Sequence, residues 1–266
     1  MATYKKRGYK KPKEKVKEVA EEILDDNTGY VEGESTTEEV FDTLDASANK
    51  AEEWFAANQK YIFGIVGVLA LGMLAYMAYG KFIQSPKESE AANDMFKAQT
   101  YFTQAVNASG KAKDSLFNLA LNGGEGKFGL IDITNEYSGT DAANLANYMA
   151  GMSYLNMNDY KNAVTYLDKF SSKDEVMMAN ARGGVADAFV QLNQLEDALG
   201  EYEKAANVGN NDFTAPRFLY KAAVVALDLG KNDVAAKHLT RIKDEFKTSA
   251  EASKVDALLG QAQAGK

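Results

Sequence analysis

Residues 144–170 read NLANYMAGMSYLNMNDYKNAVTYLDKF, and this stretch decides the fold because the chain repeats its pattern twice. The second copy, ANARGGVADAFVQLNQLEDALGEYEKA, covers 179–205, and the third, PRFLYKAAVVALDLGKNDVAAKHLTRI, covers 216–242. Each copy has two apolar segments around a polar turn. The turns, at Asn158-Asp159, Asn193-Gln194 and Gly230-Lys231, recur 35 and 37 residues apart. This period predicts a stack of helix pairs.

Residue size follows one register through the three copies. The small residues of the first helix are Gly151, Ala186 and Ala223, and those of the second helix are Ala163, Ala198 and Ala235. Four residues further on stand the larger Leu167, Tyr202 and Leu239, one helical turn away on the same face. Small residues let paired helices approach closely, so this pattern is typical of the tetratricopeptide (TPR) repeat. The predicted fold class is all-α, a TPR-like α-solenoid.

The repeat domain extends beyond the three copies. A fourth, less regular unit is expected before them, with Glu88–Val106 as its first helix and Phe128–Tyr137 as its second, after a glycine-rich link. A capping helix is expected over Ala250–Ala262, where Val255, Leu258 and Leu259 would cover the last repeat. The predicted TPR-like domain therefore spans 84–266.

The stretch before this domain predicts a transmembrane helix. Tyr61–Tyr79 reads YIFGIVGVLALGMLAYMAY, nineteen residues without a charge, and the apolar character extends to Ile83 across Lys81. A helix of this length matches the hydrocarbon core of about 30 Å. No small-residue cleavage site follows the stretch, so it predicts a permanent anchor over 61–83 that contacts the lipid bilayer.

Charge divides the part before the span. Residues 1–17 hold eight Lys/Arg and one acid, whereas 18–60 hold thirteen acids and two lysines. Lysines close to the span do not decide its orientation, but the excess of basic residues in the whole tail favours a cytoplasmic tail over 1–60 and a translocated C-terminal domain. The basic run 5–17 could contact anionic lipid or ribosomal RNA, or it could serve only as a topology signal.

Two amphipathic helices are expected in the tail. A short one is marked by Val16, Val19, Ala20 and Ile23, and residues 25–36 after it have the composition of a disordered linker. The second, Thr37–Gln59, is acidic, so an anionic bilayer should repel it. A protein partner or simple extension of the membrane helix fits this segment better.

The sequence argues against an enzyme. It has no cysteine and a single histidine, His238, which excludes thiolate sites and leaves no second histidine for a zinc site. Gly124-x-Gly126-x-x-Gly129 resembles a dinucleotide motif, but no strand precedes it and Met149 stands where an acid is needed. No catalytic, metal-binding or cofactor-binding residues are predicted, and the glycine-rich stretch is expected to be a flexible link between helices.

Protein binding is the expected function. In TPR stacks the first helices line the inner curve, and the register places a mixed apolar and aromatic surface there, suited to an extended or unfolded apolar segment. The strongest candidates are Tyr148, Met152, Leu155, Asp187, Gln191, Arg217, Tyr220 and Val224, flanked by Leu145, Asn180, Val190 and Leu227. Alternatively, several of these residues only pack between repeats. Tyr148 and Met152 replace the Lys and Asn with which some repeat proteins grip an acidic C-terminus.

The span followed by AKDSLFNLALNGGEGKFGLIDITNEYSGTDAANLANYMAGMSYLNMNDYKNAV, residues 112–164, resembles the membrane-anchored TPR proteins of Bacteroidetes-type bacteria. These are similar to the family of ancillary subunits of the SecYEG translocon. The likeness covers roughly residues 50–260.

The resemblance implies a location in the bacterial inner membrane with periplasmic repeats. It also implies three kinds of partner: Sec translocon subunits, a membrane-anchored prolyl isomerase and unfolded secreted chains. The implied role is chaperone-like handling of secreted proteins. The alternative is a cytoplasm-facing TPR adaptor that assembles a membrane complex without binding clients.

Overall fold

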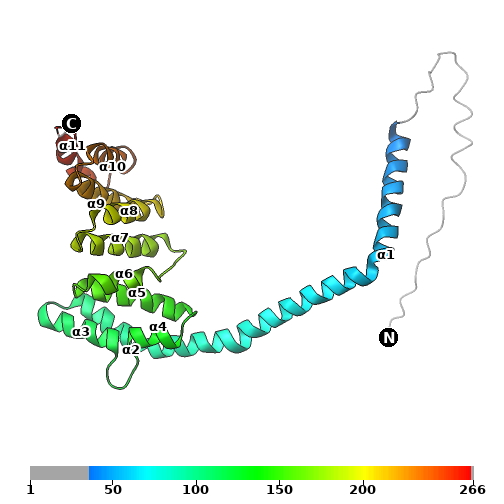
Figure 1. The fold of residues 1–266 in the computed structure, drawn as a ribbon, viewed down its shortest axis with the longest axis horizontal. Coiled ribbons are helices and arrows are strands. Elements are labelled where there is room, and N and C mark those ends of the chain that lie inside the picture. Colours follow the sequence, from blue (N-terminus) through cyan, green and yellow to red (C-terminus); the bar gives the residue numbers. More distant parts are fainter. Residues whose placement is uncertain (1–35, 265–266) are drawn as a thin grey trace, which may run out of the picture. The chain divides into compact units, whose positions relative to one another are not determined.

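The computed structural model describes residues 36–264, and this part of the chain is helical without a strand (Figure 1). The basic run, the short amphipathic helix and the linker up to residue 35 lie outside the described residues. The elements are α1 (Thr36–Tyr79), the π-helical turn η1 (Gly80–Gln84), α2 (Ser85–Asn107), α3 (Gly110–Asn122), α4 (Leu130–Glu136), α5 (Asp141–Asn156), α6 (Tyr160–Leu167), α7 (Glu175–Gln191), α8 (Leu195–Asn207), α9 (Ala215–Asp228), α10 (Asn232–Glu245), the 3₁₀ turn η2 (Ala252–Lys254) and α11 (Val255–Ala264).

Helix α1 contains the apolar span. The acidic segment 37–59 continues into it without a break, as one of the two expected alternatives. Among the described helices, one is long and apolar enough to cross a membrane, and its most apolar window is not buried anywhere in the protein. The helix continues past both ends of 61–83, so helix ends do not mark the limits of the span.

The three predicted repeats form the helix pairs α5–α6, α7–α8 and α9–α10, stacked in consecutive layers (Figure 1). Each pair turns at a residue with left-handed backbone: Asn158 at φ 62°, Asn193 at 57° and Gly230 at 70°. Asparagine and glycine are the residue types that adopt this conformation most readily. All three alanines of the second helices, Ala163, Ala198 and Ala235, are completely buried. The predicted register is confirmed.

Glycines allow close approaches both within a helix pair and between neighbouring pairs. A Cβ at Gly151 would lie 2.5 Å from Cγ of Leu167, the larger residue of the same repeat. A Cβ at Gly183 would overlap the ring of Phe218, which belongs to the next repeat and is fully buried. Gly183 therefore lets α9 pack against α7, a contact between repeats that the sequence register did not identify.

The first unit of the stack differs from the prediction. Helix α2 matches the expected first helix, but α3 lies directly after it and contributes the buried Phe117, Ala120 and Leu121. The predicted second helix, Phe128–Tyr137, is only the short α4, which begins at Leu130 and leaves Phe128 exposed. The prediction was wrong because it treated everything between residue 106 and the glycine-rich link as connection.

The glycine-rich link between α3 and α4 is compact. Gly123 has φ +81°, and a Cβ on it would meet backbone atoms of Lys127 and Gly129. Gly129 is restricted in the same way, because a Cβ there would overlap the backbone of Leu121 and Gly123. The glycines serve close backbone packing.

Polar contacts fix the start of α2 to the stack. The Glu88 carboxylate accepts from the backbone N–H groups of Asp141 and Ala142, at 2.7 and 2.8 Å. Gln84 donates to the Gly139 carbonyl and Lys87 to the Ser138 carbonyl, both at 2.9 Å. A carboxylate at a helix N-terminus is stabilised by the unpaired N–H groups and the helix dipole. The segment that leaves the apolar span is thereby joined to the N-terminus of α5.

Side chains one repeat apart also pair along the second helices of the units, α4, α6, α8 and α10, which we call the outer helices. Glu196 contacts Lys231 at 2.5 Å and Glu203 contacts the His238 ring at 2.9 Å, each across 35 residues. Helix α11 closes the stack as predicted, with Val255 buried and Leu258 and Leu259 packed against the core.

His238 makes the last repeat sensitive to pH. Burial lowers its pKa below the usual value of 6.5 and outweighs the opposing effect of Glu203, while Lys237 and Arg241 act in the same direction as burial. The unfolded chain therefore binds a proton as the pH falls through 6.5, whereas the folded chain does so only at lower pH. The part of the folding stability that depends on a neutral His238 is fully present above pH 6.5. It is lost as the pH falls from there through the pKa of His238 in the folded chain.

We expect His238→Gln to flatten this dependence, because glutamine can still donate to Glu203 but does not titrate. The measurement is the thermal midpoint of the full-length chain in detergent between about pH 5 and 8. Parallel curves for the two proteins would contradict the assignment.

Candidate binding surface

The predicted binding residues lie on α5, α7 and α9, the first helices of the three pairs. We call the partly exposed faces that carry these residues the first-helix surface. Its apolar members are half-buried: Leu145, Tyr148, Met152, Leu155, Val190, Tyr220, Val224 and Leu227. The fully buried residues of α5 include Ala146, Met149 and Ala150, at other positions of the helix. The surface is thus neither core nor fully solvated.

On α5 the candidate residues are engaged in packing between layers. The ring of Tyr148 lies 5.0 Å from the ring of Phe170. Met152 packs in a cluster with Leu167 and Val185, and Leu155 lies near Gly184. Burial raises the pKa of Tyr148. These three residues support the stack and expose only part of their surface to a partner.

Asp187 on α7 is held by an internal network. Lys221 of α9 donates to both of its carboxylate oxygens, at 2.5 and 2.8 Å, and the Tyr202 hydroxyl of α8 donates to one of them. Burial, followed by the nearby Asp187 charge, raises the pKa of Tyr202. The network joins two repeats, so a partner can use Asp187 only in competition with Lys221.

The remaining candidates are more accessible. Gln191 and Arg217 are exposed, Arg217 with its guanidinium 5.3 Å from the centre of the Phe218 ring. Tyr220 is half-buried and lies under the ammonium of Lys254 at 5.9 Å. Val224 is half-buried on the same helix. Gln191 and Arg217 are therefore the residues whose substitution tests the surface with least disturbance of the core.

The described residues hold no cluster of three or more His, Asp or Glu that could bind a metal ion. The one histidine is buried against Glu203 in the outer helices, away from the first-helix surface. The observed geometry offers half-buried apolar and aromatic groups with few charges, which is suited to binding an extended polypeptide.

Comparison with known families agrees with this geometry. A model of the tetratricopeptide repeat matches residues 148–212, from α5 through α8. The protein contains tetratricopeptide repeats. The match covers the α7–α8 repeat in full and most of the α5–α6 repeat, and it ends before α9. The third pair, α9–α10, has the same turn and the same buried alanine. A comparison with curated proteins gives no match.

TPR repeats generally mediate binding to other proteins, so the match suggests a protein-interaction scaffold. Sequence reasoning missed three features of the site: Gly183, the Asp187–Lys221 pair and the polar contacts at Glu88. Two of them had a readable signal. Two adjacent glycines inside a helix are unfavourable without a packing reason, and Asp187 and Lys221 stand one repeat apart, where stacked layers meet.

Proposed function

We propose that this protein is a membrane-anchored TPR scaffold of the bacterial inner membrane that holds extended or unfolded secreted chains near the Sec translocon. The observation that supports this most is the first-helix surface: a ribbon of half-buried Leu, Tyr, Met and Val side chains across three layers. Methionine and tyrosine adapt to varied partners, as a client-binding protein requires. The fully exposed apolar span supports the anchor.

The proposed topology has the tail in the cytoplasm and the repeats in the periplasm. Protease added to spheroplasts should digest the repeat domain while the inner membrane is intact. Protection of the domain until the membrane is breached would favour the alternative, a cytoplasm-facing adaptor that assembles a membrane complex.

The proposed partners are Sec translocon subunits and a membrane-anchored prolyl isomerase. Purification of the full-length chain in mild detergent should recover them. Recovery of an unrelated envelope complex alone would leave the scaffold and remove the proposed role in secretion.

We expect Gln191→Glu combined with Arg217→Glu to weaken client binding by about tenfold or more. Gln191→Glu adds a charge against an apolar client, and Arg217→Glu replaces the guanidinium that lies over the Phe218 ring by a shorter carboxylate. The probe is a reduced, carboxymethylated secretory protein, and binding to the full-length chain in detergent is followed by fluorescence anisotropy. The matched control is Lys161→Glu with Thr165→Glu, which makes the same charge change on the exposed face of α6. Equal loss in both variants would contradict the assigned surface.

A further inference from the structure

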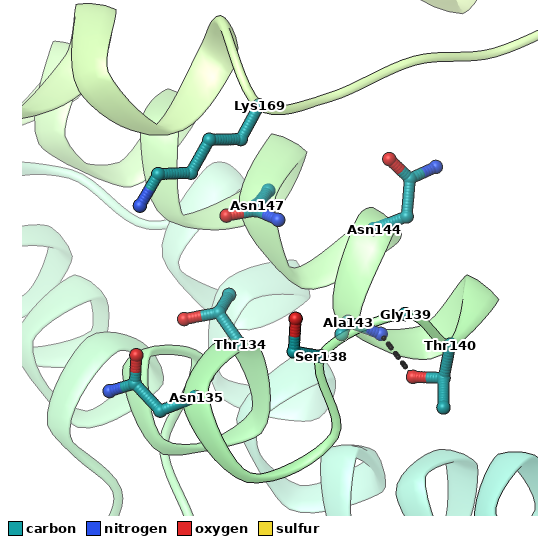
Figure 2. Close-up of a pocket in the computed structure, with 9 residues that line it drawn as sticks. All are labelled: Thr134, Asn135, Ser138, Gly139, Thr140, Ala143, Asn144, Asn147 and Lys169. Atoms are coloured by element: carbon teal, nitrogen blue, oxygen red, sulfur yellow. Dashed lines mark hydrogen bonds between the residues drawn. The ribbon is translucent and has the colours of Figure 1, made fainter.

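A cavity lies beside the first-helix surface, at the N-terminal half of α5. It has a volume of about 520 Å³, is open to solvent, and is lined by α4, the loop after it, the N-terminal half of α5 and Lys169, which follows α6 (Figure 2). The space exists because the outer helices here are short: α4 has 7 residues and α6 has 8, whereas α8 has 13 and α10 has 14. The volume is in the range of about 300–1,000 Å³ that binding pockets occupy.

The lining is polar and carries one charge. Hydroxyls come from Thr134, Ser138 and Thr140, amides from Asn135, Asn144 and Asn147, and an ammonium from Lys169; no carboxylate lines the cavity. Figure 2 shows the Lys169 chain extending over the cavity on the side of Asn147 and Thr134.

Some of these groups are paired within the protein. The Thr134 hydroxyl donates to the Ile131 carbonyl at 2.8 Å. The Asn144 amide both donates to and accepts from the backbone of Ser171, at 2.8 and 3.1 Å. These two residues shape the cavity but have little capacity left for a ligand.

Asn147 and Lys169 are different. Within the described part of the chain, the Asn147 side-chain oxygen is buried yet has no hydrogen-bond partner. An unpaired buried acceptor is unfavourable, so it favours a ligand that brings a donor. The Lys169 ammonium lies 5.1 Å from the Tyr166 ring and makes no ion pair with a described residue. It favours a ligand that brings an anion.

We propose that this cavity binds a carboxylate that has an amide N–H beside it. The carboxylate would accept from the Lys169 ammonium, and the N–H would donate to the Asn147 oxygen. An internal aspartate and the C-terminal residue of a polypeptide both carry this pair of groups. The inference rests on the proposed function only in taking a polypeptide as ligand; it adds a polar anchor point separate from the apolar first-helix surface.

The test uses the full-length chain, labelled with ¹⁵N-asparagine, in detergent micelles. The probes are Ac-Ala-Asp-Ala-NH₂ and Ac-Ala-Ala with a free C-terminal carboxylate; Ac-Ala-Asn-Ala-NH₂ is the uncharged control. We expect saturable shifts of the Asn147 side-chain signals with at least one carboxylate peptide, and which of the two binds distinguishes the sources. We expect the uncharged peptide to bind at least tenfold more weakly.

Lys169→Gln should also weaken binding at least tenfold, whereas Lys161→Gln, near the start of α6 and outside the cavity lining, should leave it unchanged. Both lysines are exposed, so neither change threatens the fold. No saturable shift, equal binding of the Asn peptide, or unaltered binding in Lys169→Gln would each overturn the proposal. None of these results depends on Gln191 or Arg217, so failure here is distinguishable from failure of the scaffold.

Discussion

Replacement of Gly183 by alanine is expected to destabilise the repeat domain by about 2–3 kcal/mol, although alanine is a better helix former than glycine. The new methyl group would overlap the ring of Phe218, which is fully buried and belongs to the next repeat. Because interiors are close-packed, neither α7 nor α9 can move without disturbing neighbouring layers. Chemical denaturation of the full-length chain in detergent, followed by circular dichroism, measures the loss.

Gly200→Ala is the matched control. Gly200 lies inside α8, and nothing stands within 4 Å of a Cβ built there. The substitution should therefore stabilise by up to about 1 kcal/mol through helix propensity alone. Phe218→Leu added to Gly183→Ala should recover part of the loss, since it removes the ring that the methyl group meets. If Gly183→Ala and Gly200→Ala behave alike, the contact between α7 and α9 is not the one described.

Leu71→Arg with Leu74→Arg is expected to release the chain from the membrane. Both residues lie in the middle of the apolar span, and both side chains are exposed on the surface of the protein. An arginine near the bilayer centre costs about 2.5–3.5 kcal/mol, whereas leucine contributes about −0.3 to −0.6 kcal/mol. Two substitutions therefore exceed the few kcal/mol by which the span favours insertion. Alkaline carbonate extraction of membranes measures retention.

The same two charges near the end of the span provide the control. In Tyr79→Arg with Phe82→Arg, the long side chains can reach the interface, so the chain should stay in the membrane. Retention of the Leu71→Arg, Leu74→Arg variant would show that the apolar stretch is not the anchor.

The sequence predicted the repeat layers well because small and large residues recur at the positions where the helices pack together. Ala163, Ala198 and Ala235 could be identified as close-contact positions from three aligned copies, and all are buried. The apolar span could be recognised from nineteen uncharged residues. In both cases the physical signal is local and periodic, so a single sequence carries it.

Other features depend on contacts between distant segments. Helix α3 was missed because it has no counterpart in the three aligned copies and begins at Gly110, which has left-handed backbone. Glu88 and Lys87 have no periodic signal, yet Glu88 binds the N-terminus of α5 and Lys87 the loop before it, each more than fifty residues away. The cavity depends on the early ends of α4 and α6, and the length of a helix is less readable than its existence.

The register also placed residues on the first-helix surface without showing how much of each is used in packing. Tyr148 and Met152 share their surface with the core, and Asp187 is paired with Lys221. Gln191 and Arg217 remain exposed. Their accessibility decides where the central claim, that the first helices hold polypeptide, can be tested.

Site-specific photo-crosslinking in native membranes tests that claim most directly. A benzophenone amino acid is introduced at Gln191 on α7 or, as the control, at Thr165 on the exposed face of α6. The account predicts cross-links to polypeptide from position 191 and few or none from position 165. Cross-linking from position 165 alone, or at equal yield from both, would contradict it.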